Sequence, residues 1–131
     1  MWLFTPVGFF SIVKADAKAA ALHGDVLVVR ARFRKDLETL IDRYIKPDLE
    51  DTHEIEELVQ RDYPYRIYVD HVVLGSIMEQ LVTEIDYTNF KNEVTKRQGH
   101  DRHALYSEVW HVMHNAEARL ERLTFLKGTK R

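Results

Sequence analysis

Four histidines near the C-terminal end of the chain are the residues whose type and spacing most directly suggest chemistry. They lie in the run HDRHALYSEVWHVMH and are His100, His103, His111 and His114. On a helical wheel, at about 100° per residue, they fall within roughly 80° of one another and share one face of a helix. The opposite face is apolar, so this pattern predicts outward histidines and a core-facing set made of Leu105, Val109, Val112, Met113, Ala116 and Leu120.

A metal site is the first chemistry that these histidines suggest. The imidazoles of His111 and His114 are spaced i, i+3, which lets two ligands converge on one ion. A tight zinc site takes about four ligands, and His103 lies roughly 12 Å from His111 along the helix axis. The spacing supplies no further ligand, although distant carboxylates could complete a site: Glu84, Asp86, Asp101 or Glu117. His103, His111 and His114 are therefore candidate metal ligands, and we expect no bound cofactor.

Three segments alternate in the manner of β-strands and supply a framework for other sites. They cover residues 8–14, 26–33 and 63–70. The middle segment is the clearest, because one of its faces carries Leu27, Val29, Ala31 and Phe33. The first two strands are expected to pair antiparallel across an alanine-rich connection at residues 15–23.

Apolar residues at helical spacing predict four helices. They run from Arg34 or Lys35 to Pro47, from Asp70 to about Glu84, from Asp86 or Thr88 to about Arg97, and from Asp101 onward. Asp70 is well placed as an N-cap, and Gly99 fits the end of the third helix. Residues 48–57 carry six carboxylates in ten positions. This stretch is expected to form an acidic loop, followed by a short helical turn around Ile55, Leu58 and Val59.

The order of these elements predicts the fold class. Three strands with helices on one face define an α+β two-layer sandwich with a small antiparallel sheet, and an arrangement related to the ferredoxin-like fold is one version of it. We find no internal repeat and no dividing linker. Residues 1–131 are therefore expected to form a single domain with a basic tail from about residue 126.

The exposed face of this sheet offers a second candidate site. Phe9, Arg30, Arg32, Arg66 and Tyr68 would lie side by side on it if the helices cover the other face. Arginines can hold phosphates and aromatic rings can stack on bases. This face is therefore a candidate site for a nucleotide, a phosphorylated ligand or single-stranded nucleic acid.

Protein interaction is the interpretation of the same residues that requires the fewest specially placed groups. An open three-stranded sheet leaves one face to be covered, and arginines and aromatic residues are frequent in interfaces. Trp110 with Tyr106, on the side of the last helix, is an alternative surface. The sequence thus favours a protein that binds a second copy of itself or another protein.

Composition excludes several other classes. With 131 residues, 45% of them apolar, the chain is large enough for a core, and its formal charge of −2 differs from that of a strongly basic nucleic-acid binder. It has no cysteine, which excludes disulfides and thiolate metal sites. No apolar run reaches the roughly 18 to 20 residues that cross a bilayer, so we expect a cytoplasmic protein without membrane contact.

Catalysis has little support in the sequence. The serines Ser11, Ser76 and Ser107 do not lie in a nucleophile elbow, and the five glycines are too scattered to form a phosphate-binding loop. An acid–base role for His71 or His103 stays open. The residue pattern nevertheless favours a protein that is not an enzyme.

Five short motifs resemble the pattern of a family of small uncharacterised bacterial proteins. They are GFFSIV, VRAR, DYPYR, IDYTNFK and the pair Val109-Trp110 before Val112-Met113. The resemblance spans roughly residues 1 to 113. It implies a bacterial, cytoplasmic origin, and it carries no established activity that could be assigned to particular residues.

Overall fold

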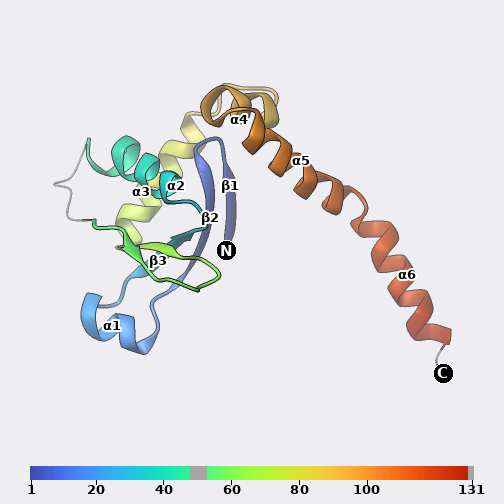
Figure 1. The fold of residues 1–131 in the computed structure, drawn as a ribbon, viewed down its shortest axis with the longest axis horizontal. Helices are drawn as coiled ribbons and strands as arrows, with labels where there is room; N and C mark the ends of the chain where they lie inside the picture. The colour runs from blue at the N-terminus through green and yellow to red at the C-terminus, as the bar shows by residue number, and fades with distance from the viewer. Residues whose placement is uncertain (48–52, 130–131) are drawn as a thin grey trace. The chain divides into compact units, whose positions relative to one another are not determined.

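The structure, a computed structural model, describes residues 1–47 and 53–129 of an α+β protein (Figure 1). The sequence predicts one domain over residues 1–131. By their internal contacts the residues group into two compact units, Met1–Thr88 and Asn89–Arg131. Each unit is described by itself below. None of the helices in the described ranges is long and apolar enough to cross a bilayer.

The first unit contains an open, fully antiparallel sheet of five strands in the order β1-β2-β3-β5-β4. The strands are β1 (Trp2–Thr5), β2 (Gly8–Lys14), β3 (Leu27–Ala31), β4 (Glu56–Glu57) and β5 (Tyr65–Val69). The prediction of three strands identified β2, β3 and β5. It missed the two short edge strands, and β4 replaces the predicted helical turn. The edge strands β1 and β4 form because they hydrogen-bond to β2 and β5. They are too short to show a period of apolar and polar side chains.

A tight turn connects β1 to β2 and begins the sheet. The hydroxyl of Thr5 donates to the carbonyl of Gly8 at 2.9 Å and accepts the backbone N–H groups of Val7 and Gly8. Pro6 fits such a turn because its ring fixes φ. This local network explains why the apolar N-terminal segment folds back on itself instead of continuing as one strand.

Four helical segments complete the first unit. They are α1 (Ala17–His23), α2 (Arg34–Leu40), a π-helical turn η1 (Ile41–Ile45) and α3 (His71–Thr83). Asp16 caps α1 through the backbone N–H of Ala19. The predicted cap of α3 is confirmed, since Asp70 accepts the backbone N–H of Val72 at 2.8 Å. The predicted acidic loop at 48–57 lies partly outside the described residues.

The hydrophobic core lies between one face of the sheet and α2, η1 and α3. The sheet contributes Phe10, Ile12, Val29, Ala31, Ile67 and Val69, and the helical segments contribute Leu37, Leu40, Ile41, Tyr44, Ile45, Leu74 and Ile77. At its edge, the hydroxyl of Tyr44 donates to a carboxylate oxygen of Glu84 at 2.7 Å. Burial and this hydrogen bond raise the pKa of Tyr44 to about 12. The hydroxyl therefore remains a donor at neutral pH.

The second unit contains three helices, α4 (Phe90–Gln98), α5 (His100–His114) and α6 (Ala116–Thr129). Asn89 caps α4 through the N–H of Asn92, so the predicted caps Asp86 and Thr88 are wrong by one residue or more. Gly99, with φ of 92°, separates α4 from α5. Its left-handed backbone explains why α5 begins at His100 rather than at Asp101.

The predicted last helix is divided in two and is longer than expected. Asn115, with φ of −89° and ψ of 0°, separates α5 from α6. The N–H of Asn115 still bonds to the carbonyl of His111, and the N–H of Arg119 bonds to the carbonyl of Asn115. Hydrogen bonding thus continues through this residue. Helix α6 reaches Thr129, whereas the sequence predicts a frayed tail from about residue 126.

Candidate functional site

The face of the sheet opposite the core carries four of the residues predicted for a ligand or interface site: Phe9, Arg30, Arg66 and Tyr68. We call it the outer face, and it comprises Trp2, Phe4, Phe9, Ser11, Val13, Val28, Arg30, Arg66 and Tyr68. Strand register places Trp2 opposite Ser11, Ser11 opposite Arg30, and Arg30 opposite Arg66, and Arg66 is opposite Glu56. One row of side chains therefore crosses all five strands.

Arg30 and Arg32 share one aromatic partner that the sequence did not single out. The ring of Tyr63 lies 4.9 Å from the guanidinium carbon of Arg30 and 4.6 Å from that of Arg32. Arg30 also donates to the hydroxyl of Ser11 at 2.8 Å, and Arg32 forms an exposed ion pair with Asp62 at 2.9 Å. Tyr63 precedes β5 and belongs to no strand, so alternation gave no signal for its position.

Arg66 and Tyr68 lie beside each other on β5, with Glu56 on the neighbouring strand. Burial and the carboxylate of Glu56 raise the pKa of Tyr68 above its usual value, while Arg66 acts in the opposite direction. The ring of Tyr68 stacks on that of His23 at 3.7 Å. The end of α1 therefore covers this part of the outer face.

The side-chain Nε atoms of Arg30 and Arg66 are buried, and neither has a hydrogen-bond partner within residues 1–47 and 53–129. Burying an unpaired donor costs free energy, since water no longer satisfies it. Both guanidiniums are partly buried and carry charge on a sheet surface. The centre of the outer face thus carries two positive charges with hydrogen-bond donors that the protein does not satisfy.

Three aromatic rings occupy the β1–β2 side of the outer face. Phe4 stacks on Phe9 with ring centroids 4.4 Å apart, and Trp2 meets Phe9 edge-on at 6.2 Å. Trp2 is 70% exposed, so much of its indole is available to another molecule. Sequence reasoning found Phe9 but missed Trp2 and Phe4, because it did not recognise β1.

The candidate metal ligands lie in the second unit, where each contacts a side chain that is not a metal ligand. Nδ1 of His103 hydrogen-bonds to the hydroxyl of Thr95 on α4. The ring of His114 stacks on Trp110 at 4.7 Å, and that of His111 meets Trp110 edge-on at 5.1 Å. Among the described residues, no group of three or more histidine or carboxylate side chains is placed to hold an ion.

Trp110 also has a cationic neighbour. The ammonium nitrogen of Lys91 lies 5.1 Å from the centroid of the indole ring. Tyr106, which the sequence paired with Trp110, is buried and stacks on Phe90 of α4 at 5.9 Å. Trp110 is therefore partly exposed beside two histidines and a lysine, whereas Tyr106 helps join α4 to α5.

Most apolar side chains along one face of α5 and α6 are exposed, although the sequence predicts that six of them face a core. We call this set the helix stripe, and it comprises the six predicted residues Leu105, Val109, Val112, Met113, Ala116 and Leu120 together with Leu123 and Leu126. Val109 and Ala116 are half-buried, and the other six are exposed. Val112 is 52% exposed, Met113 67% and Leu120 64%. These members of the predicted core set do not contribute to the hydrophobic core. Helical periodicity was correct here, but it cannot show what covers an apolar face.

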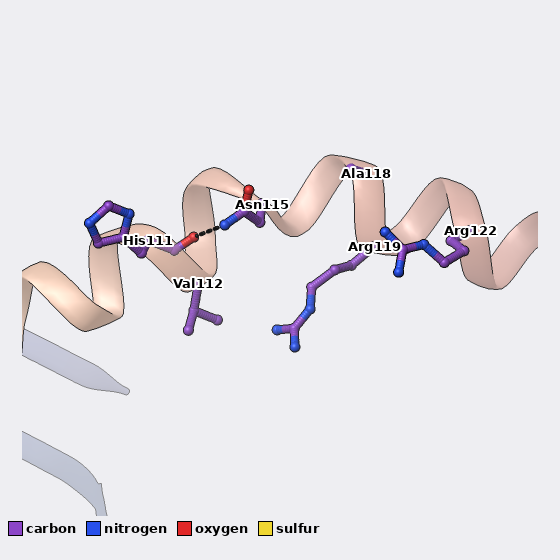
Figure 2. A pocket seen from close by; sticks show the side chains of 6 residues that line it. All are labelled: His111, Val112, Asn115, Ala118, Arg119 and Arg122. Atoms are coloured by element: carbon purple, nitrogen blue, oxygen red, sulfur yellow. Dashed lines mark hydrogen bonds between the residues drawn. The ribbon is translucent and has the colours of Figure 1, made fainter.

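A shallow groove of about 370 Å³ runs along one side of the α5–α6 junction. Its lining residues are His111, Val112, Asn115, Ala118, Arg119 and Arg122. Figure 2 shows Val112 and Arg119 extending from the same side of the helix, and the side-chain amide of Asn115 bonded to the carbonyl of His111 at 2.9 Å. The groove therefore combines an edge of the helix stripe with two cations.

Comparisons with family models, with curated proteins and with solved structures find no match to this chain. The outer face and the helix stripe are therefore the features of this chain from which a function can be inferred.

Proposed function

We propose that this protein is a non-catalytic interaction protein that associates with a second copy of itself through α5 and α6. The helix stripe is the observation that carries the proposal. Its leucines at positions 105, 120, 123 and 126 are between 42% and 64% exposed. A contiguous exposed apolar surface of this kind is typical of an interaction site. Pairing with another helix would remove it from water.

The helix stripe is continuous enough to act as one interface. At about 100° per residue, its eight members fall within roughly 140° of one another on a helical wheel. The hydrogen bonds on both sides of Asn115 keep the two helices in succession. The stripe thus has the width of a helical face that packs against another helix rather than that of scattered surface residues.

An antiparallel second copy fits the order of residues along the stripe. In an antiparallel pair with position 114 of one copy opposite position 114 of the other, Leu105 of one copy is opposite Leu123 of the other. Val112 is then opposite Ala116. Each of these pairs is equally spaced on either side of position 114. The same contacts then occur twice, as a two-fold symmetric interface requires.

Charges beside the stripe support this orientation. Glu108, on α5, lies on the same side of the helical wheel as Arg119 and Arg122 on α6. Neither arginine forms an ion pair within the described ranges of the chain. In the antiparallel arrangement, Glu108 of one copy comes level with both arginines of the second copy, in the groove of Figure 2.

The first test removes the apolar contact. Replacing Leu120 and Leu123 together by glutamate is expected to raise the dissociation constant of the dimer at least about 100-fold, because each buried leucine contributes roughly 1.5–3 kcal/mol and a tenfold change needs about 1.4. Sedimentation equilibrium of the full chain at micromolar concentrations measures this constant. The matched control is Phe125→Glu, since Phe125 is 69% exposed and lies on the opposite side of α6.

Two results would contradict self-association through the helix stripe. One is a wild-type chain that is monomeric throughout the concentration range, in which case the stripe binds a different protein or nothing. The other is equal loss of the dimer in the Phe125→Glu control, which would show that the effect is not specific to the stripe.

The second test addresses the antiparallel register. Glu108→Arg is expected to weaken the dimer by two- to tenfold, because it places like charges beside Arg119 and Arg122 of the second copy. Combining it with Arg119→Glu and Arg122→Glu is expected to restore the wild-type dissociation constant, since the pairing is then reversed. A triple variant weaker than Glu108→Arg alone would exclude this register, even if a dimer forms.

A further inference from the structure

The pairing of Arg30 with Arg66 is unfavourable for stability by itself. The two residues are directly opposite on β3 and β5, and like charges at such positions repel each other. Both Nε atoms are buried without a hydrogen-bond partner in the described part of the chain. Neither guanidinium forms an ion pair within those same ranges. Glu56 lies opposite Arg66 on the β4 side, and a bound anion between the two guanidiniums would offset the repulsion on the β3 side.

The protein holds both guanidiniums in place from several directions. Ser11 accepts from an Nη atom of Arg30 at 2.8 Å, and the ring of Tyr63 packs on the same guanidinium. Arg66 lies two residues before Tyr68 on the same face of β5, and the ring of Tyr68 is itself stacked on His23. A guanidinium has five N–H donors, so donors remain on both side chains after these contacts. Paired arginines with fixed geometry are well suited to a phosphate group.

An exposed aromatic ring lies in the same row as the two arginines. Trp2 is opposite Ser11, which is opposite Arg30, so its Cα lies about 10 Å from that of Arg30 at ordinary strand spacing. The long side chains of tryptophan and arginine can shorten this separation. Phe9 supports the indole edge-on, and the 70% exposed indole can stack on a planar ring.

We propose that the outer face binds a mononucleotide, with the phosphate between Arg30 and Arg66 and the base against Trp2. In the described residues, Arg32, beside this face, pairs with Asp62. The other rings on or beside the face are already engaged: Tyr63 is buried, Tyr68 stacks on His23, and Phe4 stacks on Phe9. One ring and one pair of arginines match one nucleotide. A long polyanion is disfavoured by the net charge of −2, whereas a single phosphate responds mainly to charges within about 10 Å.

The test compares three probes by isothermal titration calorimetry on the full chain: adenosine monophosphate, adenosine and inorganic phosphate. The monophosphate is expected to bind at least ten times more tightly than either part alone, because both ends of the site contribute. Arg30→Gln, Arg66→Gln and Trp2→Ala are each expected to weaken its binding at least tenfold. Arg34→Gln is the matched control, since Arg34 is an exposed arginine paired with Glu38 on α2.

A fluorescence titration adds a readout specific to stacking. Trp2 and Trp110 are the two tryptophans of the chain, so a Trp110→Phe variant reports on Trp2 alone. The monophosphate is expected to quench this fluorescence with the calorimetric dissociation constant, and inorganic phosphate is expected to leave it unchanged. Circular dichroism of each arginine variant checks that lost binding is not lost folding, and Arg66→Lys, which keeps the charge without the fork, should bind with intermediate affinity.

Three outcomes would overturn the proposal. Inorganic phosphate binding as tightly as the monophosphate would exclude a role for Trp2. An oligothymidylate that binds where the monophosphate does not would indicate a single-strand surface. No binding of any probe, or equal loss in the Arg34→Gln control, would remove the site altogether. Repeating the titration on the Leu120→Glu, Leu123→Glu variant separates this site from self-association, because the expected affinity is unchanged.

Discussion

Replacing Gly8 by alanine is expected to lower the free energy of unfolding by about 2–4 kcal/mol. A Cβ atom at position 8 would lie 2.7 Å from both Cβ and Cγ of Asp36, closer than carbon atoms can approach. Overpacking a core typically costs roughly 1–3 kcal/mol, and a buried donor that loses its partner costs about as much again. The expected effect combines both costs.

Asp36 cannot move aside without breaking a hydrogen bond. Its carboxylate accepts the backbone N–H of Phe9 at 3.0 Å, and the residue is 2% exposed in the first turn of α2. This contact ties α2 to the start of β2. The sequence predicts both elements, but it gives no sign that they meet through a glycine and an aspartate, because the two positions are far apart along the chain.

Equilibrium urea unfolding of Gly8→Ala, Asp36→Gly and the double variant tests this contact. Asp36→Gly removes the Cβ that the new methyl would meet, so adding Gly8→Ala to it should cost less than about 1 kcal/mol. Strict additivity of the two single effects would show that the close approach is not the cause. Gly75→Ala in α3 is the matched control, with no atom within 4 Å of its added Cβ. It is expected to stabilise the protein by about 0.5–1 kcal/mol.

Elements with a strong local signal could be predicted from the sequence. Strand β2 extends over Gly8–Lys14, as its alternation indicates, and α3 begins after the cap at Asp70. The alternation also placed Arg30 and Arg66 on the same face as Phe9. In each case the deciding information lies within a few neighbouring residues, since the side-chain period and the cap are local properties.

Elements that depend on distant partners could not be predicted. Trp2–Thr5 and Glu56–Glu57 are too short to show a period, and they are strands because β2 and β5 offer them an edge. Tyr63 contacts two arginines from outside any strand. The sequence therefore predicted the arginines of the outer face. It did not predict the ring of Tyr63 that packs on Arg30 and Arg32, or the exposed indole of Trp2.

The helix stripe shows a different limit of sequence analysis. Leu120 and Met113 have the spacing of core residues, and the same spacing suits an interface between two chains. Their exposure of 64% and 67% shows that they are not core residues of this chain, and helical spacing does not contain that information. The histidines were predicted to face outward, and His100, His111 and His114 are exposed, whereas His103 is half-buried and bonds to Thr95 on α4. A helical wheel treats one helix at a time, so it could not show this contact between helices.

Two adjacent residues of β5 are expected to differ strongly in their contribution to stability. Ile67 is 0% exposed and lies in the core cluster, whereas Arg66 lies on the outer face. Ile67→Ala should lower the free energy of unfolding by about 2–5 kcal/mol, because it leaves a cavity in a packed core. Ile85→Ala, the same change at a residue that is 54% exposed, should cost less than about 1 kcal/mol.

Arg66→Gln is expected to change the unfolding free energy by less than about 1 kcal/mol, because it removes both the repulsion from Arg30 and the attraction to Glu56, which lie opposite Arg66 on its two sides. Urea unfolding of Arg66→Gln, Ile67→Ala and Ile85→Ala, without nucleotide, measures all three effects. A loss of more than 2 kcal/mol in Arg66→Gln, roughly the lower limit for a core truncation, would assign this arginine a structural role. Neutral or increased stability would instead mean that the outer face carries a charge that folding does not need, which is the expected property of a side chain retained for binding.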